Sequence, residues 1–127
     1  MQEKMKRILL IDDDPATLDV IKILFEMEGF EVLGLADTAE LYPSILSFKP
    51  SVILMDVLIG AIDGRDICAE LKASTYKHIP LMLMSVVSKF TEDPSHPMFC
   101  DDYIHKPFEL DVMLSKVRKL ILDHSVT

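Results

Sequence analysis

Short apolar runs alternate with longer amphipathic stretches along the whole chain. The runs have the length of buried strands, and in the longer stretches apolar residues recur with the spacing of one helical face. The runs predict strands at residues 7–11, 30–35, 51–55, 80–84 and 102–105. The amphipathic stretches predict helices at residues 15–28, 38–48, 63–73 and 109–122. Strands that alternate with helices favour an α/β fold, here a doubly wound, five-stranded sheet covered on both faces.

Charged and hydroxyl side chains follow four of these strands at the point where each strand ends. They are Asp12, Asp13, Asp14, Asp56, Ser85 and Lys106. In an open α/β sheet, ligands bind outside the carboxyl ends of the strands, so these groups are expected to share one crevice. Two carboxylates about 4 Å apart repel each other by roughly 4 kcal/mol at an effective dielectric of about 20. Clustered acids therefore indicate a bound cation, and carboxylates together with phosphate oxygens are typical ligands of Mg²⁺.

The acidic triplet also has a simpler interpretation, in which it forms a solvated turn that caps the helix at residues 15–28. Asp14 followed by Pro15 fits the N-cap and the first helical position. Asp14 is therefore predicted to be the cap, which leaves Asp12 and Asp13 for a metal ion.

Five separated segments, in this order, resemble the response-regulator receiver family of two-component signalling. They are residues 11–15, 54–57, 63–64, 84–85 and 101–108. The resemblance covers nearly the whole chain and rests on all five segments at family-like spacing. It implies a flavodoxin-like, CheY-like fold with parallel strands in the order 2-1-3-4-5. It also implies one receiver domain over residues 1–127, with no output domain in this chain.

The resemblance assigns the metal ligands and the phosphorylated residue. Asp12 and Asp13 match the acidic pair that holds Mg²⁺ directly or through water. Asp56 matches the phospho-accepting carboxylate, which also binds the metal. The backbone carbonyl of Leu58 would complete the protein ligands of Mg²⁺.

Other matching residues would contact the phosphoryl group or respond to it. Ser85 matches the hydroxyl that hydrogen-bonds this group, and Lys106 matches the ammonium that pairs with it. Tyr103 matches the switch aromatic, which turns inward when the hydroxyl residue moves. The bond between Lys106 and Pro107 is expected to be cis, because family members use a cis bond there to aim the lysine.

The function that the resemblance implies is a phospho-accepting switch. Asp56 would take a phosphoryl group from a phosphohistidine of a sensor histidine kinase or of a histidine phosphotransfer protein, with Mg²⁺ as cofactor. The change would alter the binding of a downstream protein partner. The chain would not be an enzyme in the usual sense, because it would catalyse only its own phosphorylation and dephosphorylation. A weak homodimer stays open.

Composition narrows the choice of partners. The net charge of -8 argues against direct nucleic-acid binding, because Lys and Arg on phosphates supply most non-specific affinity. No apolar run approaches the roughly 18 to 20 residues of a membrane helix, so a cytoplasmic protein is expected. Cys68 and Cys100 are not spaced as a metal or redox pair, which indicates two reduced thiols without a functional role.

Three other functions fit parts of this sequence. Asp12 and Asp14 resemble the nucleophile motif of haloacid-dehalogenase-like phosphatases, but that family needs an acidic pair after its lysine, and Asp101 and Asp102 precede Lys106. A flavodoxin-like cofactor binder is disfavoured, since three carboxylates after the first strand would repel a ligand phosphate. A receiver-like docking module that works without phosphorylation keeps the fold and stays open.

Three positions depart from the family pattern. Gly60 stands where the family usually has proline, so a more permissive loop is expected over the site. Val86 replaces the usual Ala or Gly after the hydroxyl residue. Phe99 and Cys100 replace the usual Gly-Ala. These departures leave the charged residues intact, and they bear on reaction rates and on the output surface.

Two expectations follow for the region beyond the fourth strand. Leu58, Val86 and Val87 are bulky and apolar where the family lines the approach to the aspartyl phosphate, so slow phosphorylation and slow dephosphorylation are expected. Pro94 and Pro97 interrupt residues 88–100, which show no helical period. The fourth helix of the family is therefore expected to be short, shifted or partly irregular.

Overall fold

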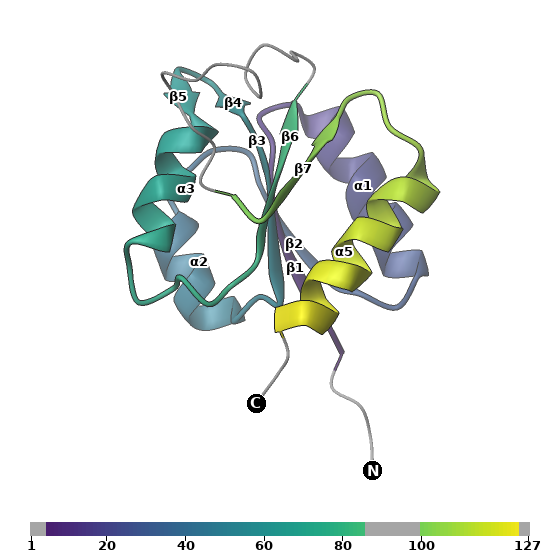
Figure 1. The fold of residues 1–127 in the computed structure, drawn as a ribbon. Helices are drawn as coiled ribbons and strands as arrows, with labels where there is room; N and C mark the ends of the chain where they lie inside the picture. Colours follow the sequence, from purple (N-terminus) through teal and green to yellow (C-terminus); the bar gives the residue numbers. More distant parts are fainter. Residues whose placement is uncertain (1–4, 86–99, 125–127) are drawn as a thin grey trace.

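The computed structural model describes residues 5–85 and 100–124 of the chain. Its centre is a parallel sheet of five strands, in the order β2-β1-β3-β6-β7 (Figure 1). The strands are β1 (Arg7–Ile11), β2 (Glu31–Leu35), β3 (Val52–Asp56), β6 (Leu81–Ser85) and β7 (Asp102–His105). Numbered among themselves, these strands have the order 2-1-3-4-5, so the predicted fold class and topology are confirmed.

Helices cover both faces of the sheet. α1 (Pro15–Met27) and α5 (Leu110–His124) lie on one face, and α2 (Leu41–Phe48) and α3 (Gly64–Lys72) lie on the other (Figure 1). Ile8 and Leu10 of β1 join the core under α1 and α5, whereas Leu9 and Ile11 join the core under α2 and α3. Both faces of β1 are thus buried, which explains why its sequence is a continuous apolar run.

The helix boundaries agree with the prediction to within three residues at each end. The side chain of Asp14 accepts a hydrogen bond from the N–H of Ala16, and Pro15 begins α1, so the predicted cap is confirmed. α2 begins at Leu41, which places Pro43 in the first turn, where proline is tolerated. The prediction for a fourth helix concerns residues 89–99, which lie outside the described residues.

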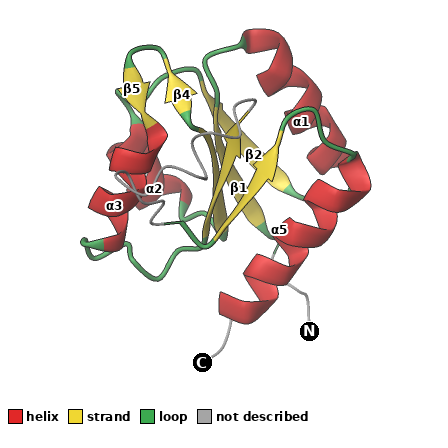
Figure 2. Ribbon diagram, turned by 45° about the horizontal axis from the view of Figure 1, so that its top comes forward, coloured by secondary structure: helices red, strands yellow, loops and turns green. Residues whose placement is uncertain are grey.

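A small hairpin between β3 and α3 was not predicted. It consists of β4 (Leu58–Ile59) and β5 (Ile62–Asp63), which pair antiparallel. Figure 2 shows the two short strands apart from the main sheet. Gly60, where a more permissive loop is expected from the sequence, lies in a defined two-residue turn between β4 and β5.

A charged cluster fixes the opposite, amino end of β6 and β7. Oδ2 of Asp101 accepts hydrogen bonds from the N–H of Leu81, at 2.8 Å, and from Nζ of Lys72 in α3. Nε2 of His124, the last residue of α5, lies 3.5 Å from Oδ1 of the same carboxylate. One side chain therefore ties α3, β6 and α5 to the start of β7, the strand that carries Lys106 at its far end. Within the described residues, no helix combines the length and the apolar character that crossing a bilayer requires.

Candidate functional site

Three carboxylates meet at the carboxyl end of the sheet. Asp12 directly follows β1 and is 1% exposed, Asp13 is its exposed neighbour, and Asp56 is the last residue of β3. One carboxylate oxygen from each of the three residues lies within 4.8 Å of the other two. The prediction that these three acids lie close together at the carboxyl end of the sheet is confirmed.

Lys106 brings a positive charge to this cluster from the end of β7. Its Nζ donates to Oδ2 of Asp12 at 2.6 Å and to Oδ2 of Asp56 at 2.9 Å. The backbone N–H of Lys106 donates to the carbonyl of Ser85 at 2.7 Å, which joins the ends of β7 and β6. The bond from Lys106 to Pro107 is cis, as the resemblance led us to expect.

Burial and pairing set the charges of these groups. Burial raises the pKa of Asp56 above its ordinary value, and the hydrogen bond from Lys106 offsets only part of this effect. Burial on its own would lower the pKa of Lys106, but the hydrogen bonds to Asp12 and Asp56 more than compensate, so the pKa is raised. The lysine stays protonated at neutral pH, and three carboxylates around one ammonium leave an excess of acidic groups.

Backbone N–H groups hold the three carboxylates in place. Oδ1 of Asp12 accepts from the N–H of Asp14 at 2.9 Å, within the turn that starts α1. Oδ2 of Asp13 accepts from the N–H of Gly60 at 2.9 Å, and Oδ1 of Asp56 accepts from the N–H of Leu58 at 3.3 Å. The sequence did not reveal these contacts, because any residue except proline carries the same donor.

Gly64 allows the chain to pass closely behind Asp56. Its N–H donates to the carbonyl of Val57, and a Cβ at this position would lie 2.6 Å from the backbone oxygen of Asp56. A side chain there would push β3 or α3 out of place. The glycine of the Asp63-Gly64 motif is thus explained by a close approach of two backbone segments.

The donor set fits the predicted metal. Carboxylate oxygens from Asp12, Asp13 and Asp56 are ligands that suit a hard cation such as Mg²⁺, and the surplus of acidic groups favours cation binding. Leu58, whose carbonyl the resemblance adds as a ligand, follows Asp56 by two residues and begins β4.

The predicted switch residues lie on two neighbouring strands. Ser85 ends β6 and is 2% exposed, at the same end of the sheet as Asp56. Tyr103 of β7 is partly buried against the core under α2 and α3. Its hydroxyl is hydrogen-bonded with Nε2 of His105, and the two rings pack edge to face at 4.9 Å. Val86 and Val87 lie outside the described residues, so the crowding argument stays a prediction.

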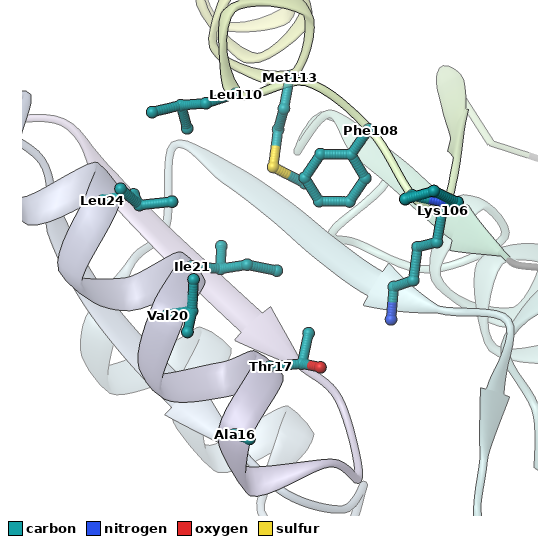
Figure 3. A pocket seen from close by; sticks show the side chains of 10 residues that line it. Ala16, Thr17, Val20, Ile21, Leu24, Lys106, Phe108, Leu110 and Met113 are labelled. Atoms are coloured by element: carbon teal, nitrogen blue, oxygen red, sulfur yellow. The ribbon is translucent and has the colours of Figure 1, made fainter.

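A pocket of about 420 Å³ opens beside Lys106, between α1 and the start of α5. Figure 3 shows Ile21 and Leu24 of α1 facing Phe108 and Met113, with the Lys106 side chain running along the edge. Most of the lining side chains are apolar. This pocket could not be predicted from the sequence, because it forms between segments that lie far apart in the chain.

Comparison with known proteins gives one consistent result. A family model for the response regulator receiver domain matches residues 8–118. The DNA-binding dual master transcriptional regulator RpaA of Synechocystis is 31% identical over 119 residues, which cover 92% of this chain and 49% of RpaA. The chain spans about half the length of the curated relatives it matches.

Solved structures resemble the whole fold. Response regulator protein TrrA of Thermotoga maritima, determined in complex with Mg(2+)-BeF, gives a TM-score of 0.81 at 28% identity, with 91% of this chain and 99% of TrrA covered. The signal receiver domain of a signal transduction histidine kinase from Syntrophus aciditrophicus gives a TM-score of 0.84 at 27% identity, with 96% and 94% covered.

Proposed function

This chain belongs to the response-regulator receiver family, and from that membership we propose that it accepts a phosphoryl group on Asp56 in a Mg²⁺-dependent reaction. The observation that carries the proposal is the position of Lys106, whose Nζ contacts both Asp12 and Asp56 at the mouth of an acidic cluster. This arrangement places a fixed positive charge next to the carboxylate that would bear the phosphoryl group. A flexible lysine elsewhere on the surface would not supply such charge stabilisation.

In the proposed reaction, a carboxylate oxygen of Asp56 attacks the phosphorus of a phosphohistidine. The new O–P bond forms as the N–P bond breaks, and the electron pair of the N–P bond returns to the imidazole. Phosphoryl transfer needs mainly positioning and charge stabilisation from the protein. Lys106 would then pair with a phosphoryl oxygen, and Ser85 would hydrogen-bond another.

Mg²⁺ would be held by Asp12, Asp13, Asp56 and the carbonyl of Leu58, and it would neutralise negative charge that builds up on the phosphoryl oxygens. The structure of TrrA with Mg(2+)-BeF supports this cofactor, because TrrA is similar to this chain over nearly its whole length.

The pocket beside Lys106 supports a protein as phosphoryl donor, namely a histidine kinase or a histidine phosphotransfer protein. Val20 of α1 lines this pocket and is more than half exposed, and Ile23 and Met27 of the same helix are also apolar and more than half exposed. A helix of the donor that packed there would lie next to the ammonium that contacts Asp56. A cytoplasmic location follows from such a partner, and the phosphorylated form would switch binding of a downstream protein.

Intact-mass measurement tests the proposal. The purified chain is incubated with acetyl phosphate and MgCl₂, and we expect the mass of one phosphoryl group to be added. The same incubation with EDTA, or with the Asp56→Asn variant, should add nothing. A chain that gains no mass under any of these conditions is better described as a docking module that works without phosphorylation. Mass gain that persists in Asp56→Asn would place the reaction on another residue.

A further inference from the structure

Gly60 reaches the acidic cluster through its backbone. Its N–H donates to Oδ2 of Asp13 at 2.9 Å, although 47 positions separate the two residues. Proline, which the receiver family usually has at this position, carries no N–H and could not make this contact. The hydrogen bond is therefore a feature of this chain that depends on its departure from the family pattern.

The conformation of Gly60 explains the choice of glycine. Its φ is +61°, in the left-handed region, and it occupies the first position of the two-residue turn between β4 and β5. Glycine at that position is typical of a type II′ hairpin turn. A Cβ on Gly60 would meet no heavy atom within 4 Å, so the backbone conformation rather than lack of space favours glycine.

The hairpin that carries Gly60 is anchored at both ends. At its first residue, the N–H of Leu58 donates to Asp56, the proposed phospho-acceptor. At its last residue, Asp63 caps α3 and pairs with Arg65, whose Nη2 lies 2.6 Å from Oδ2 of Asp63. Arg65 is 5% exposed, so the partner of Asp63 is buried. The turn is thus a fixed support from which the N–H of Gly60 can orient the exposed carboxylate of Asp13.

We propose that Gly60 is a positioning residue for the metal site, whose N–H holds the carboxylate of Asp13 facing those of Asp12 and Asp56. The inference rests on the proposed Mg²⁺ site and adds a determinant of Mg²⁺ affinity that is not itself a ligand. Hydrogen-bond partners that orient metal ligands typically change metal affinity by about 10-fold to 100-fold when they are removed. Without this hydrogen bond the ion itself has to order the Asp13 side chain, and this lowers the affinity for Mg²⁺.

Three variants separate the N–H group from the shape of the turn. Gly60→Pro removes the donor. Gly60→Asn keeps it, and asparagine tolerates a left-handed φ better than most residues. Ala61→Gly loosens the same turn and also keeps the donor. The full chain is titrated with MgCl₂ by calorimetry. We expect Gly60→Asn and Ala61→Gly to bind within about threefold of the unmodified chain, and Gly60→Pro to bind at least about tenfold more weakly.

A second measurement tests the contact in the absence of metal. The amide resonance of Gly60 is followed by NMR in the metal-free chain and in Asp13→Ala. We expect a large shift of this resonance in Asp13→Ala and none in Glu40→Ala, a matched loss of a carboxylate at the start of α2. Because proline cannot adopt a φ of +61°, this measurement also decides the question if Gly60→Pro fails to fold.

Each outcome decides whether Mg²⁺ affinity depends on the N–H of Gly60 or on the shape of the turn. Equal Mg²⁺ affinity in Gly60→Pro and the unmodified chain would overturn the inference. So would a loss in Ala61→Gly as large as the loss in Gly60→Pro, because turn shape would then suffice. An unchanged Gly60 resonance in Asp13→Ala would exclude the contact. An unmodified chain that binds no Mg²⁺ would overturn the metal site itself, which distinguishes failure of the proposed function from failure of the positioning role.

Discussion

Nζ of Lys106 lies 2.9 Å from Oδ2 of Asp56, although 50 positions separate the two residues in the sequence. The same ammonium contacts Asp12, which is 1% exposed. We expect Lys106→Met to slow phosphorylation by acetyl phosphate at least about tenfold, because the charge that stabilises the transferred group is lost. The initial rate of mass gain measures this effect.

Lys116→Met is the matched control for that variant. Lys116 of α5 pairs with Asp102 at 3.1 Å, away from the carboxylates of the acidic cluster. Its loss should leave the rate within about twofold of the unmodified chain, because Asp102 begins β7 at the end opposite Lys106. Equal rates in the two variants would show that Lys106 has no special role in the transfer.

The Asp56→Asn variant should be more stable than the unmodified chain when Mg²⁺ is absent. Burial disfavours the ionised carboxylate of Asp56, and an amide of the same shape removes this cost. We expect the Tm in EDTA to rise by a few degrees. Addition of MgCl₂ should raise the Tm of the unmodified chain more than that of the variant, since the variant lacks one ligand. A lower Tm for the variant in EDTA would contradict the argument.

Gly64→Ala should destabilise the chain strongly, because its Cβ would lie 2.6 Å from the backbone oxygen of Asp56. Relief of such a clash requires a backbone shift that costs on the order of 1 to 3 kcal/mol. Gly34→Ala is the control, since its Cβ would meet a side-chain atom of Leu18 at an ordinary 3.6 Å. Urea unfolding of both variants measures the difference, and similar midpoints would refute the prediction.

Tyr42→Phe should change the stability of the chain in alkaline solution. Burial, followed by the hydrogen bond to Glu70, raises the pKa of Tyr42 to about 12 from an ordinary value of 10.0. Between these two pH values the unfolded chain releases the phenol proton first, so the free energy of unfolding falls as pH rises. The phenylalanine variant lacks this proton, and its unfolding free energy should fall less steeply from about pH 10 to 12.

At pH 7 the same variant should lose about 0.5 to 1 kcal/mol with the hydrogen bond to Glu70. Tyr76→Phe serves as the control, because Tyr76 packs against Tyr42 at 6.2 Å between ring centroids and leaves the Tyr42 hydroxyl on Glu70. Urea titrations at several pH values give both quantities. Parallel pH profiles for Tyr42→Phe and the unmodified chain would contradict the assignment.

The sheet and the charged residues of the site could be predicted from the sequence because each leaves a local signal. β1 is a continuous apolar run that ends in acids, and parallel strands place their carboxyl ends at one edge. These two signals predict that Asp12, Asp56 and Lys106 lie close together, as the hydrogen bonds of Lys106 confirm. The role of Asp14 as a helix cap followed in the same way from the proline after it.

The hairpin over the site could not be predicted, for two physical reasons. β4 and β5 have two residues each, which is too short for any alternation of apolar and polar positions to appear. The contacts that tie the hairpin to Asp13 and Asp56 come from backbone N–H groups, which residue type does not reveal. Gly60 was the one available signal, and its freedom of φ suggested a loose loop where the structure has a turn.

The cluster around Asp101 lies at the amino ends of β6 and β7, opposite the carboxylates of the site. The first residue of β1, Arg7, and the last residue of α5, His124, lie at this same end of the molecule (Figure 1). A fluorescent protein fused before Arg7 or after His124 would be attached at this end of the molecule. The acidic cluster and the pocket beside Lys106 would remain open to a large partner. The molecule is therefore well suited to carry a reporter dye or a surface tether while its docking with a partner is followed in real time.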